Sequence, residues 1–488
     1  MVENCANCFI REKHNVDAST LGAYIRSFDL NASQEEAVLS CICARECHHQ
    51  NSVKLIWGPP GTGKTKTIGA LLFAFFKRKC RTLTCAPTNV AVLEVTTRLL
   101  NLVIPKLEYQ TYGLGDIILF GNGERMKICN HDDLLDVFLD CRAHILSNCF
   151  APSSGWNYHL RLMICLLEDP GKLYHEYLQE LANRKKDKNF KAQEKGILRN
   201  EKIQNNKEKQ DDVNSKKSRN QNNNVFWRKV ILQTLEESKK TWKEKSCCRK
   251  ESRLKHNTKV NMVHFSQDHE IEGLTFEEFV NCKFNYCKDQ MRMHVVIMHT
   301  HLPSSVISPR VVKMMIEFLE FLELLDSLLQ AADEGLSHAF SQSMDEPYGI
   351  GFSKQPKLEE AREHCLQKLK LLHSKFTLPD IFGESKIKHF CLENARLIFC
   401  TASSSAKLYA EDMLRSSLEV LIIDEAAQLK ECESTIPLQF PGLRHAILVG
   451  DECQLPAMVQ SKVSASYSCF SHFPCSCVFS LSFQRELI

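Results

Sequence analysis

The sequence predicts an α/β fold in which a parallel sheet is interrupted by a large, mainly helical insertion. An apolar strand, a glycine-rich loop and a buried helix follow one another within residues 53–76. Four further apolar segments end in polar residues, namely 81–86, 395–400, 418–423 and 445–449. Ligands of open parallel sheets gather where strands end in this way. Between these segments, residues 106–394 follow mostly the 3.6-residue period of helices.

The glycine-rich loop carries a phosphate-binding motif. Residues 58–65 read GPPGTGKT, which fits Gly, four residues, then Gly-Lys-Thr. Glycines let the backbone wrap a polyphosphate, and the following helix adds free N–H groups and the positive end of its dipole. We therefore expect a P-loop NTPase in which Lys64 contacts the β- and γ-phosphates and Thr65 contacts Mg²⁺. The residues expected to bind the nucleotide are Gln34, Gly58, Pro59, Pro60, Gly61, Thr62, Gly63, Lys64, Thr65 and Lys66.

Composition is ordinary for a soluble protein, with 43% hydrophobic and 25% charged residues. No apolar run approaches the roughly 18 residues of a membrane span, and residues 1–15 lack the apolar centre of a signal peptide. The 23 cysteines are expected to be reduced, in the nucleus or cytosol, with the nucleus favoured. Zinc binding is the alternative for the thiols and imidazoles of Cys5, Cys8, Cys41, Cys43, Cys47, His48 and His49. No paired knuckle at standard spacing supports it.

The net charge of +3 hides a division within the chain. Residues 181–260 hold 24 Lys and Arg against 10 Asp and Glu, which leaves 38 basic and 49 acidic residues elsewhere. Asn-rich runs with few branched apolar residues predict that much of this basic segment is disordered. Phe226, Trp227 and Trp242 interleave with its lysines, which favours stacking of single-stranded bases. A solvated charged loop is the alternative.

The chain begins with an arm over residues 1–30, and a helix is expected to follow at Ser33. Ser33 is a candidate N-cap, and Glu36 completes a capping box. Gln34 lies at a suitable distance before the phosphate loop for an amide that pairs with adenine. Capping alone would make Gln34 an ordinary first-turn residue.

The second strand, residues 81–86, ends in Pro87, Thr88 and Asn89, and a helix over residues 90–100 follows. This turn offers hydroxyl, amide and backbone N–H groups, which suit a phosphodiester backbone. The alternative is a plain strand-to-helix turn in which Asn89 is the cap.

The insertion is expected to contain one strand at residues 115–122 and several helices. Residues 274–298, 311–330 and 358–372 follow helical patterns. The Met and Phe residues of 311–330 are better explained as core than as a binding surface.

The strand at 418–423 delivers an acidic pair. Asp424 is expected to hold Mg²⁺ together with Thr65, and Glu425 to polarise the water that attacks the γ-phosphate. Gln454, after the next strand, is expected to contact the γ-phosphate or that water. The catalytic residues are therefore expected to be Lys64, Glu425 and Gln454. The alternative for the acids is a helix N-terminus that favours negative charge.

Six motifs appear in the order found in superfamily 1 helicases: Gln34, GPPGTGKT (58–65), APTNVAV (86–92), TAS (401–403), DEAAQ (424–428) and GDECQLP (450–456). The chain most resembles the senataxin-like and nonsense-decay branch, DNA/RNA helicases that translocate 5′ to 3′, since it has DEAA where others have DEAD. The resemblance implies a RecA-like domain that uses ATP and Mg²⁺ and binds single-stranded RNA or DNA. It implies that the strand backbone is gripped by Pro87, Thr88, Asn89, Thr401, Ala402 and Ser403.

The resemblance divides the chain into an arm (1–30), a first motor part (31–105), an insertion or accessory subdomain (106–394), a second motor part (395–463) and an atypical tail (464–488). Helicases of this branch carry a second RecA-like domain with arginines that complete the ATP site. Only 32 residues follow Pro456, so we expect a chain cut short after its first motor domain. ATP binding with slow hydrolysis and no unwinding is then expected. The alternative is a non-translocating ATP-binding module for nucleic acid or protein.

Overall fold

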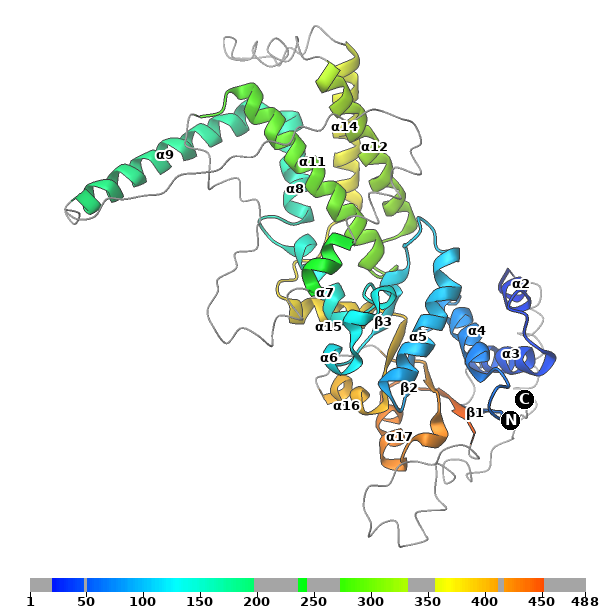
Figure 1. The fold of residues 1–488 in the computed structure, drawn as a ribbon. Coiled ribbons are helices and arrows are strands. Elements are labelled where there is room, and N and C mark those ends of the chain that lie inside the picture. The colour runs from blue at the N-terminus through cyan, green and yellow to red at the C-terminus, as the bar shows by residue number, and fades with distance from the viewer. Residues whose placement is uncertain are drawn as a thin grey trace.

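The computed structural model describes residues 20–47, 51–196, 236–243, 273–331, 356–410 and 417–451. Figure 1 shows a sheet with flanking helices at one end of the molecule and an elongated group of helices at the other. None of the helices in these ranges has both the length and the apolar character that crossing a membrane requires.

The sheet has six strands, all parallel, in the order β1-β6-β5-β2-β4-β3. The strands are β1 (Ser52–Trp57), β2 (Thr82–Ala86), β3 (Ile117–Leu119), β4 (Leu397–Thr401), β5 (Val420–Ile423) and β6 (His445–Gly450). The α/β fold with a parallel sheet is therefore confirmed, and five strands come from the segments predicted outside the insertion.

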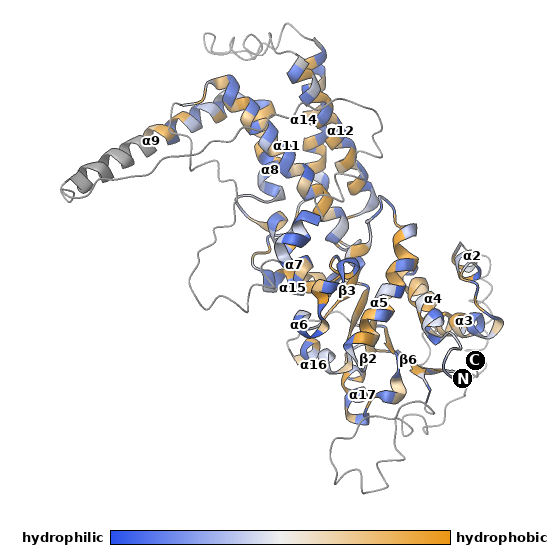
Figure 2. Cartoon of the chain, in the orientation of Figure 1, coloured by the Kyte–Doolittle hydropathy of each residue, from blue (hydrophilic) through white to orange (hydrophobic). Residues whose placement is uncertain are grey.

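The strands form because their residues are apolar and often branched, which suits a sheet covered on both faces. Every residue of β2, β4, β5 and β6 is buried, and these strands are among the most hydrophobic parts of the molecule (Figure 2). The sheet is accordingly a core element.

Helices accompany the strands on either side of the insertion. They are α2 (Thr20–Arg26), α3 (Ala32–Glu46), α4 (Lys64–Lys77), α5 (Asn89–Val103), α16 (Ala402–Ala410) and α17 (Glu431–Leu438). Helix α4 follows the phosphate loop and buries Phe73 and Phe75, and it packs between α3 and α5. The strand, loop and helix predicted around GPPGTGKT are thus all present.

The predicted cap of α3 was wrong by two positions. Asn31, not Ser33, caps the helix: its side-chain oxygen accepts from the N–H of Gln34 at 2.8 Å. The Gln34 side chain completes the capping box by accepting from the N–H of Asn31 at 3.0 Å. Asn is at least as good a cap as Ser, and only this register buries Gln34.

Strand β3 forms within the predicted range 115–122 but lies at the edge of the main sheet, beside β4. The long insertion therefore leaves the sheet after β3 and returns at the neighbouring strand. The buried Arg142 fixes this junction, since its guanidinium donates to the carbonyls of Leu114 at 2.9 Å, Gly115 at 3.1 Å and Asp136 at 2.7 Å.

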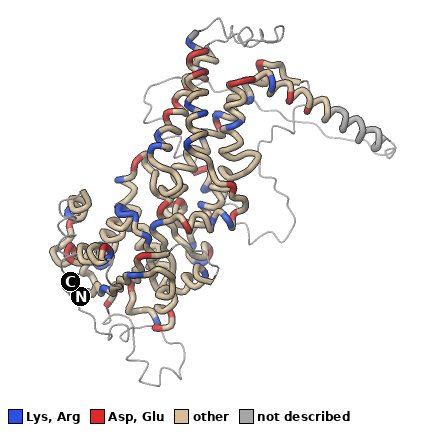
Figure 3. The backbone as a smooth tube through the Cα atoms, turned by 180° about the vertical axis from the view of Figure 1, so that it is seen from behind, with Lys and Arg blue, Asp and Glu red and all other residues tan. Residues whose placement is uncertain are grey.

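The insertion is mainly helical, as predicted. Its helices are α6 (Gly123–Met126), α7 (Leu139–Phe150), α8 (Trp156–Glu168), α9 (Pro170–Gly196), α11 (Phe276–His301), α12 (Pro309–Ala331), α14 (Pro356–Lys375) and α15 (Glu384–Asn394). Helix α12 packs against α14 and buries Met315, Phe318 and Leu322, which confirms that its Met and Phe residues belong to the core. Acidic and basic residues are interspersed along these helices (Figure 3).

The basic segment 181–260 is described only over 181–196, which continues α9, and over a helical stretch at 236–243. Trp242 is 8% exposed and its ring meets Phe138 edge to face at 5.8 Å, and it also lines a cavity described below, so base stacking by Trp242 stays a prediction. Lys239 pairs with Asp136 at 2.6 Å and holds this stretch against the segment that precedes α7. Phe226 and Trp227 lie outside the described residues.

Helix α11 buries several histidines, namely His294, His299 and His301. Burial lowers the pKa of His294 to about 3 and that of His299 to about 4. A histidine whose pKa is depressed in the folded state favours folding above pH 6.5, which is about its pKa in the unfolded state. This contribution to stability is lost as pH falls. The helical part is therefore expected to weaken in mild acid.

We predict that His294→Leu reduces the loss of stability between pH 7.5 and pH 5.5 by about 1 kcal/mol, because the unfolded imidazole takes up a proton at pH 5.5 and the buried one does not. Chemical unfolding at the two pH values measures this. His373→Gln, at an exposed position of α14, is the control. An unchanged pH dependence in His294→Leu contradicts the prediction.

Candidate functional site

The sheet order divides the candidate site into two halves. Strands β1, β6 and β5 are neighbours and end in the phosphate loop, in Gly450 and in the acidic pair. Strands β2, β4 and β3 are the remaining neighbours and end in the turns after Ala86, Thr401 and Leu119. Since all the strands are parallel, the six ends lie along the same edge of the sheet.

The phosphate loop is shaped by glycines in backbone conformations that other residues rarely adopt. Gly61 and Gly63 have φ angles of +80° and +87°. The ammonium group of Lys64 donates to the carbonyls of Gly58 at 2.6 Å and Pro59 at 3.3 Å, so the side chain folds over the loop. Thr65 lies in the first turn of α4 and is half-buried. A cradle of N–H groups and a cation thus surround the position that a polyphosphate takes in such loops.

Gln34 supports this loop from below. Its side-chain N–H donates to the carbonyl of Thr62 at 2.8 Å, while its oxygen is used in the cap of α3. A Cβ at Gly63 would come within 2.6 Å of the Gln34 amide nitrogen, so the two segments are in close contact. Lys66, in α4, donates to the carbonyl of Asp29 and so links α4 to the segment that precedes α3. Pairing of Gln34 with adenine stays a prediction, and it requires these two amide hydrogen bonds to be exchanged.

Asp424 is a buried acid, 6% exposed, at the end of β5. Burial, with the neighbouring charges of Glu425 and Glu94, raises its pKa to about 7, against the opposing effects of the Glu425 N–H and of Lys64. A buried carboxylate with too little positive charge around it suits a divalent cation. The carboxylate of Asp424 and the hydroxyl of Thr65 are hard oxygen donors of the kind that Mg²⁺ prefers, so the residues present fit this metal.

Glu425 has a φ of +51°, an uncommon conformation for a residue with a side chain. Its carboxylate accepts from the side-chain N–H of Gln428 at 3.1 Å, and its backbone N–H donates to Asp424 at 3.0 Å. This backbone places the two carboxylates of the pair differently: Asp424 is buried in the fold, and Glu425 is half-exposed. The second acid is therefore accessible to water, as a general base must be.

The end of β6 packs on the acidic turn. A Cβ at Gly450 would lie 3.2 Å from the backbone nitrogen of Ala427 and 3.3 Å from that of Ala426, which is tighter than ordinary contact. Gly450 therefore permits β6 and the turn after Glu425 to lie against each other. The predicted catalytic residue Gln454 lies outside the described residues.

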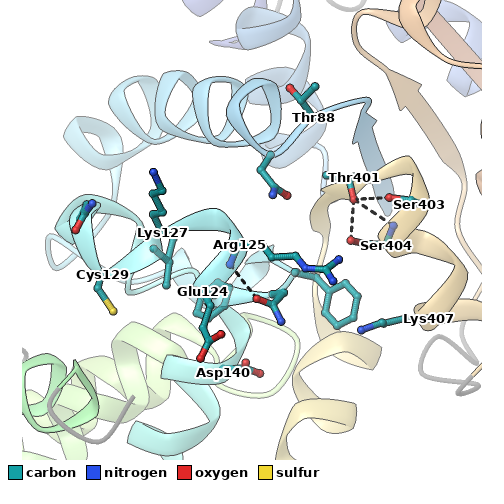
Figure 4. Close-up of a pocket in the computed structure, with 18 of the residues that line it drawn as sticks. Thr88, Glu124, Arg125, Lys127, Cys129, Asp140, Thr401, Ser403, Ser404 and Lys407 are labelled. Atoms are coloured by element: carbon teal, nitrogen blue, oxygen red, sulfur yellow. Dashed lines mark hydrogen bonds between the residues drawn. The ribbon is translucent and has the colours of Figure 1, made fainter. Parts of the chain in front are cut away.

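The other half of the edge borders a cavity of about 1230 Å³. The predicted strand-gripping residues Pro87, Thr88, Asn89, Thr401 and Ser403 all line it, and Figure 4 shows Thr88, Thr401 and Ser403 along one side. The structure thus brings together two turns that lie more than 300 residues apart in the sequence. Ala402 is the exception, because it is 1% exposed and belongs to the core.

Both turns are held by their own hydroxyls. Thr88, rather than Asn89, caps α5 by accepting from the N–H of Ala91 at 3.2 Å. The Thr401 hydroxyl donates to the hydroxyl of Ser404 at 2.7 Å and accepts from the Ser404 N–H at 3.1 Å (Figure 4). The Ser403 hydroxyl lies 3.2 Å from that of Thr401. These bonds fix each turn and leave Asn89 and Ser403 facing the cavity as its polar lining.

The prediction missed the rest of the lining. The segment after β3, the start of α7 and parts of α15 and α16 close the cavity with further residues: Phe120, Gly121, Asn122, Gly123, Glu124, Arg125, Lys127, Ile128, Cys129, Asn130, Phe138, Asp140, Lys388, Ser404 and Lys407, with Trp242. The sequence indicated only the segment after β3, because polar residues follow that predicted strand as they follow the two others.

The cysteines of α3 do not support a metal site. Cys41, Cys43 and Cys47 are buried, as the thiol interpretation predicts. Within the described ranges, no group of three or more His, Cys, Asp or Glu is arranged to hold a metal ion. Cys5, Cys8, His48 and His49 lie outside those ranges.

Comparison with known proteins decides the family. A family profile described as an AAA domain matches residues 29–273 and 339–462, well over half of the chain. The chain belongs to the AAA domain family. The match spans both halves of the site, because the matched residues include the phosphate loop, the acidic pair and the turns after β2 and β4.

Curated relatives of this AAA domain are helicases and a DNA-binding protein. Helicase SEN1 of Saccharomyces cerevisiae is 29% identical over 153 residues, 26% of this chain and 6% of that protein. The regulator of nonsense transcripts 1 homolog of Arabidopsis thaliana is 42% identical over 72 residues, 14% of this chain and 5% of that protein. The DNA-binding protein SMUBP-2 of Rattus norvegicus is 40% identical over 70 residues, 14% of this chain and 6% of that protein.

These matches confirm the resemblance to superfamily 1 helicases of the senataxin-like and nonsense-decay branch. The chain spans only a small fraction of the length of each relative, 5% to 6% for the three proteins above. The similarity therefore concerns the AAA domain and not the whole of those proteins.

We predict that Asp424→Asn raises the melting temperature at pH 8 by several degrees when divalent cations are absent. A carboxyl group whose pKa is raised to about 7 in the folded state stabilises the fold only while it is protonated. Its contribution to the free energy of unfolding is lost as pH rises from about 4 through 7. The substitution removes the buried charge, so the gain is large at pH 8 and small at pH 5. Thermal unfolding at both pH values measures it.

The control for this experiment is Asp380→Asn, at an exposed position. An Asp424→Asn variant that melts below the wild type at pH 8 is inconsistent with an uncompensated charge at this position.

Proposed function

We propose that this chain binds ATP and Mg²⁺ and hydrolyses ATP when a single strand of RNA or DNA occupies the cavity beside the nucleotide. One observation carries the proposal: one edge of the sheet bears a phosphate loop and acidic pair on three neighbouring strands, and a polar cavity on the other three. Helicases of the matched branch need both sites in one domain. The family and the relatives' names support this assignment.

The roles of the nucleotide-site residues follow from their positions. Lys64 exchanges its bonds to the loop carbonyls for oxygens of the β- and γ-phosphates, and the N–H groups of Gly61 to Thr65 bind the remaining oxygens. Thr65 and Asp424 hold the metal, which when bound neutralises charge on the phosphate oxygens. Gln454 is the proposed sensor of the γ-phosphate.

Glu425 acts as the general base. Its half-exposed carboxylate takes a proton from the water whose oxygen attacks the γ-phosphorus, and ADP leaves from the opposite side. Gln428 holds the carboxylate through the 3.1 Å bond from its amide. Gly450, packed on the turn after Glu425, keeps the pair in place.

Translocation is a separate matter from ATP hydrolysis. All the described strands belong to one sheet, whereas the branch closes two RecA-like domains on the strand and completes its ATP site with arginines from the second. Such arginines increase the rate by about 10³ to 10⁵. We therefore propose that the described domain by itself hydrolyses ATP slowly when a strand is bound, and that unwinding needs a second RecA-like domain. The proposed place of action is the nucleus or the cytoplasm, with the nucleus favoured.

The test is a set of binding and activity measurements on the full chain. Fluorescent ATP analogues measure nucleotide binding, labelled 20-nucleotide strands measure nucleic-acid binding, and phosphate release measures hydrolysis. ATP binding without any strand binding contradicts the proposal, and so does unchanged ATP binding in Lys64→Ala.

We predict that Glu425→Gln lowers strand-stimulated phosphate release by about 10² to 10³ and leaves ATP affinity within about twofold, because it removes the base but keeps the shape and the bond to Gln428. Glu431→Gln, an acid in the first turn of α17, is the control. Equal activity in Glu425→Gln and wild type assigns the base elsewhere.

We also predict that Gly450→Ala lowers hydrolysis more than it lowers stability. The added methyl pushes on backbone nitrogens at 3.2 and 3.3 Å, which cannot move aside as a flexible side chain can, and so shifts the acidic turn. Phosphate release and thermal unfolding of the same preparation measure the two effects. Loss of stability without a change in activity per folded molecule contradicts this account.

A further inference from the structure

One stretch of the basic segment docks beside the cavity. Within residues 197–272 the structure describes 236–243, a helical stretch that we call the strap. Its exposed residues are Glu236, Glu237, Lys240 and Thr241, and its covered residues are Ser238, Lys239, Trp242 and Lys243. Residues three and four apart lie on the same face of a helix. The strap therefore has one face against the protein and one face in solvent.

The covered face of the strap matches the surface that receives it. Trp242 is 8% exposed, and its ring meets Phe138 edge to face at 5.8 Å. Two lysines of the strap pair with acids: Lys239 with Asp136 at 2.6 Å, and Lys243 with Asp132. A buried Trp is a common anchor where one segment docks on another. These contacts therefore define a docking site for a basic segment that carries one Trp.

The two acids that receive the strap lie at the rim of the cavity. They belong to the segment between Asn130 and Phe138, two residues that line the cavity. Asp136 is largely buried, and its Oδ1 atom has no hydrogen-bond partner among the described residues. His301 lies 4.0 Å from this atom and adds no charge, because burial holds its pKa well below the ordinary value. Without its lysine partner, the Asp136 carboxylate would be a poorly compensated charge beside the cavity.

The strap forms part of the cavity wall and does not fill the cavity. Trp242 lines the cavity, whose volume is about 1230 Å³ with the strap in place. Asp132 and Asp136 are each two residues from a lining residue, which is at most about 8 Å between Cα atoms. A nucleic-acid strand is a polyanion, and the Debye length is about 10 Å at 0.1 M salt. Unpaired acids at this rim would therefore repel a strand, and the docked strap cancels their charge.

We propose that the strap is a charge-cancelling wall of the strand cavity: Trp242 seats it on Phe138, and its two covered lysines neutralise Asp132 and Asp136. The effect on nucleic acid rests on the proposed function, whereas the docking does not depend on it. The proposal gives one part of the basic segment a defined role that differs from general attraction of polyanions. This part acts on acids 103 and 111 residues away in the sequence.

Hydrogen exchange of the full chain, followed by mass spectrometry, tests the docking. Trp242→Ala is expected to speed amide exchange within 236–243 by about tenfold or more, because loss of the anchor releases the strap. Lys240→Gln, on the exposed face of the strap, is the control and is expected to keep exchange within about twofold of the wild type. Equal exchange in the wild type and in Trp242→Ala overturns the docking.

Fluorescence anisotropy with a labelled 20-nucleotide oligodeoxythymidylate tests the charge cancellation in the full chain. Lys239→Gln/Lys243→Gln is expected to lower affinity about fivefold at about 50 mM salt and less at about 200 mM, because salt screens the two unmasked acids. Adding Asp132→Asn/Asp136→Asn to this variant removes those acids and is expected to restore affinity to within about twofold.

The matched control for the lysine variant is Lys313→Gln/Lys370→Gln. It also removes two lysines that pair with acids, Glu317 and Glu168, but in the helical part. Its affinity is expected to stay within about twofold of the wild type. Thermal unfolding checks that each variant is folded, and fluorescent ATP analogues check the nucleotide site.

The outcomes separate failure of the strap from failure of the proposed function. If the wild type binds the strand and Lys239→Gln/Lys243→Gln binds it equally well or more tightly, the charge-cancelling role is overturned and the proposed function stands. An equal loss in the control, or no recovery when both acids are removed, also overturns that role. If the wild type binds ATP and no strand, the proposed function fails and the role in strand binding with it, while hydrogen exchange still reports whether the strap docks.

Discussion

The common direction of the six strands is the constraint on which the rest of the structure depends. In a parallel sheet every carboxyl end lies at the same edge, and the backbone groups within the strands are used in pairing. Chemistry is therefore confined to the turns that follow the strands. Because strands from before and after the insertion are interleaved in the sheet, residues hundreds of positions apart become neighbours at that edge.

The two halves of the edge are joined by the backbone itself. The N–H of Asp424 donates to the carbonyl of Cys85 at 2.9 Å, one residue before Ala86 and the turn of Thr88. Glu94, on the helix that Thr88 caps, contributes to the raised pKa of Asp424. A change at Asp424 thus reaches the turn of Thr88 through one hydrogen bond and one electrostatic interaction, without any long chain of intermediates.

The sequence predicted the strands and the loop well, for a physical reason. Strands buried on both faces appear as short continuous apolar runs, and a phosphate loop needs glycines at fixed positions. It could not predict strand order, which depends on pairing across the insertion. The cap of α3 was misplaced because Asn31 and Ser33 are both good caps, and only the buried contact between Gln34 and Thr62 selects between them. Lysines surround Trp242 in the sequence, which could not show that its ring contacts Phe138 and is largely buried. The β3 turn was missed because its strand was assigned to the insertion by position alone.

The insertion leaves and rejoins the sheet at adjacent strands, and this has an architectural consequence. Its helices could change in length or number while β3 and β4 keep their pairing, so the insertion can vary without a change in the sheet. The sheet sets a lower limit, because two adjacent parallel strands need a crossover of about a dozen residues or more. A minimal motor core built from this chain would therefore keep the residues up to Arg142, which fixes the junction, and bridge back to Arg396 with one short helix.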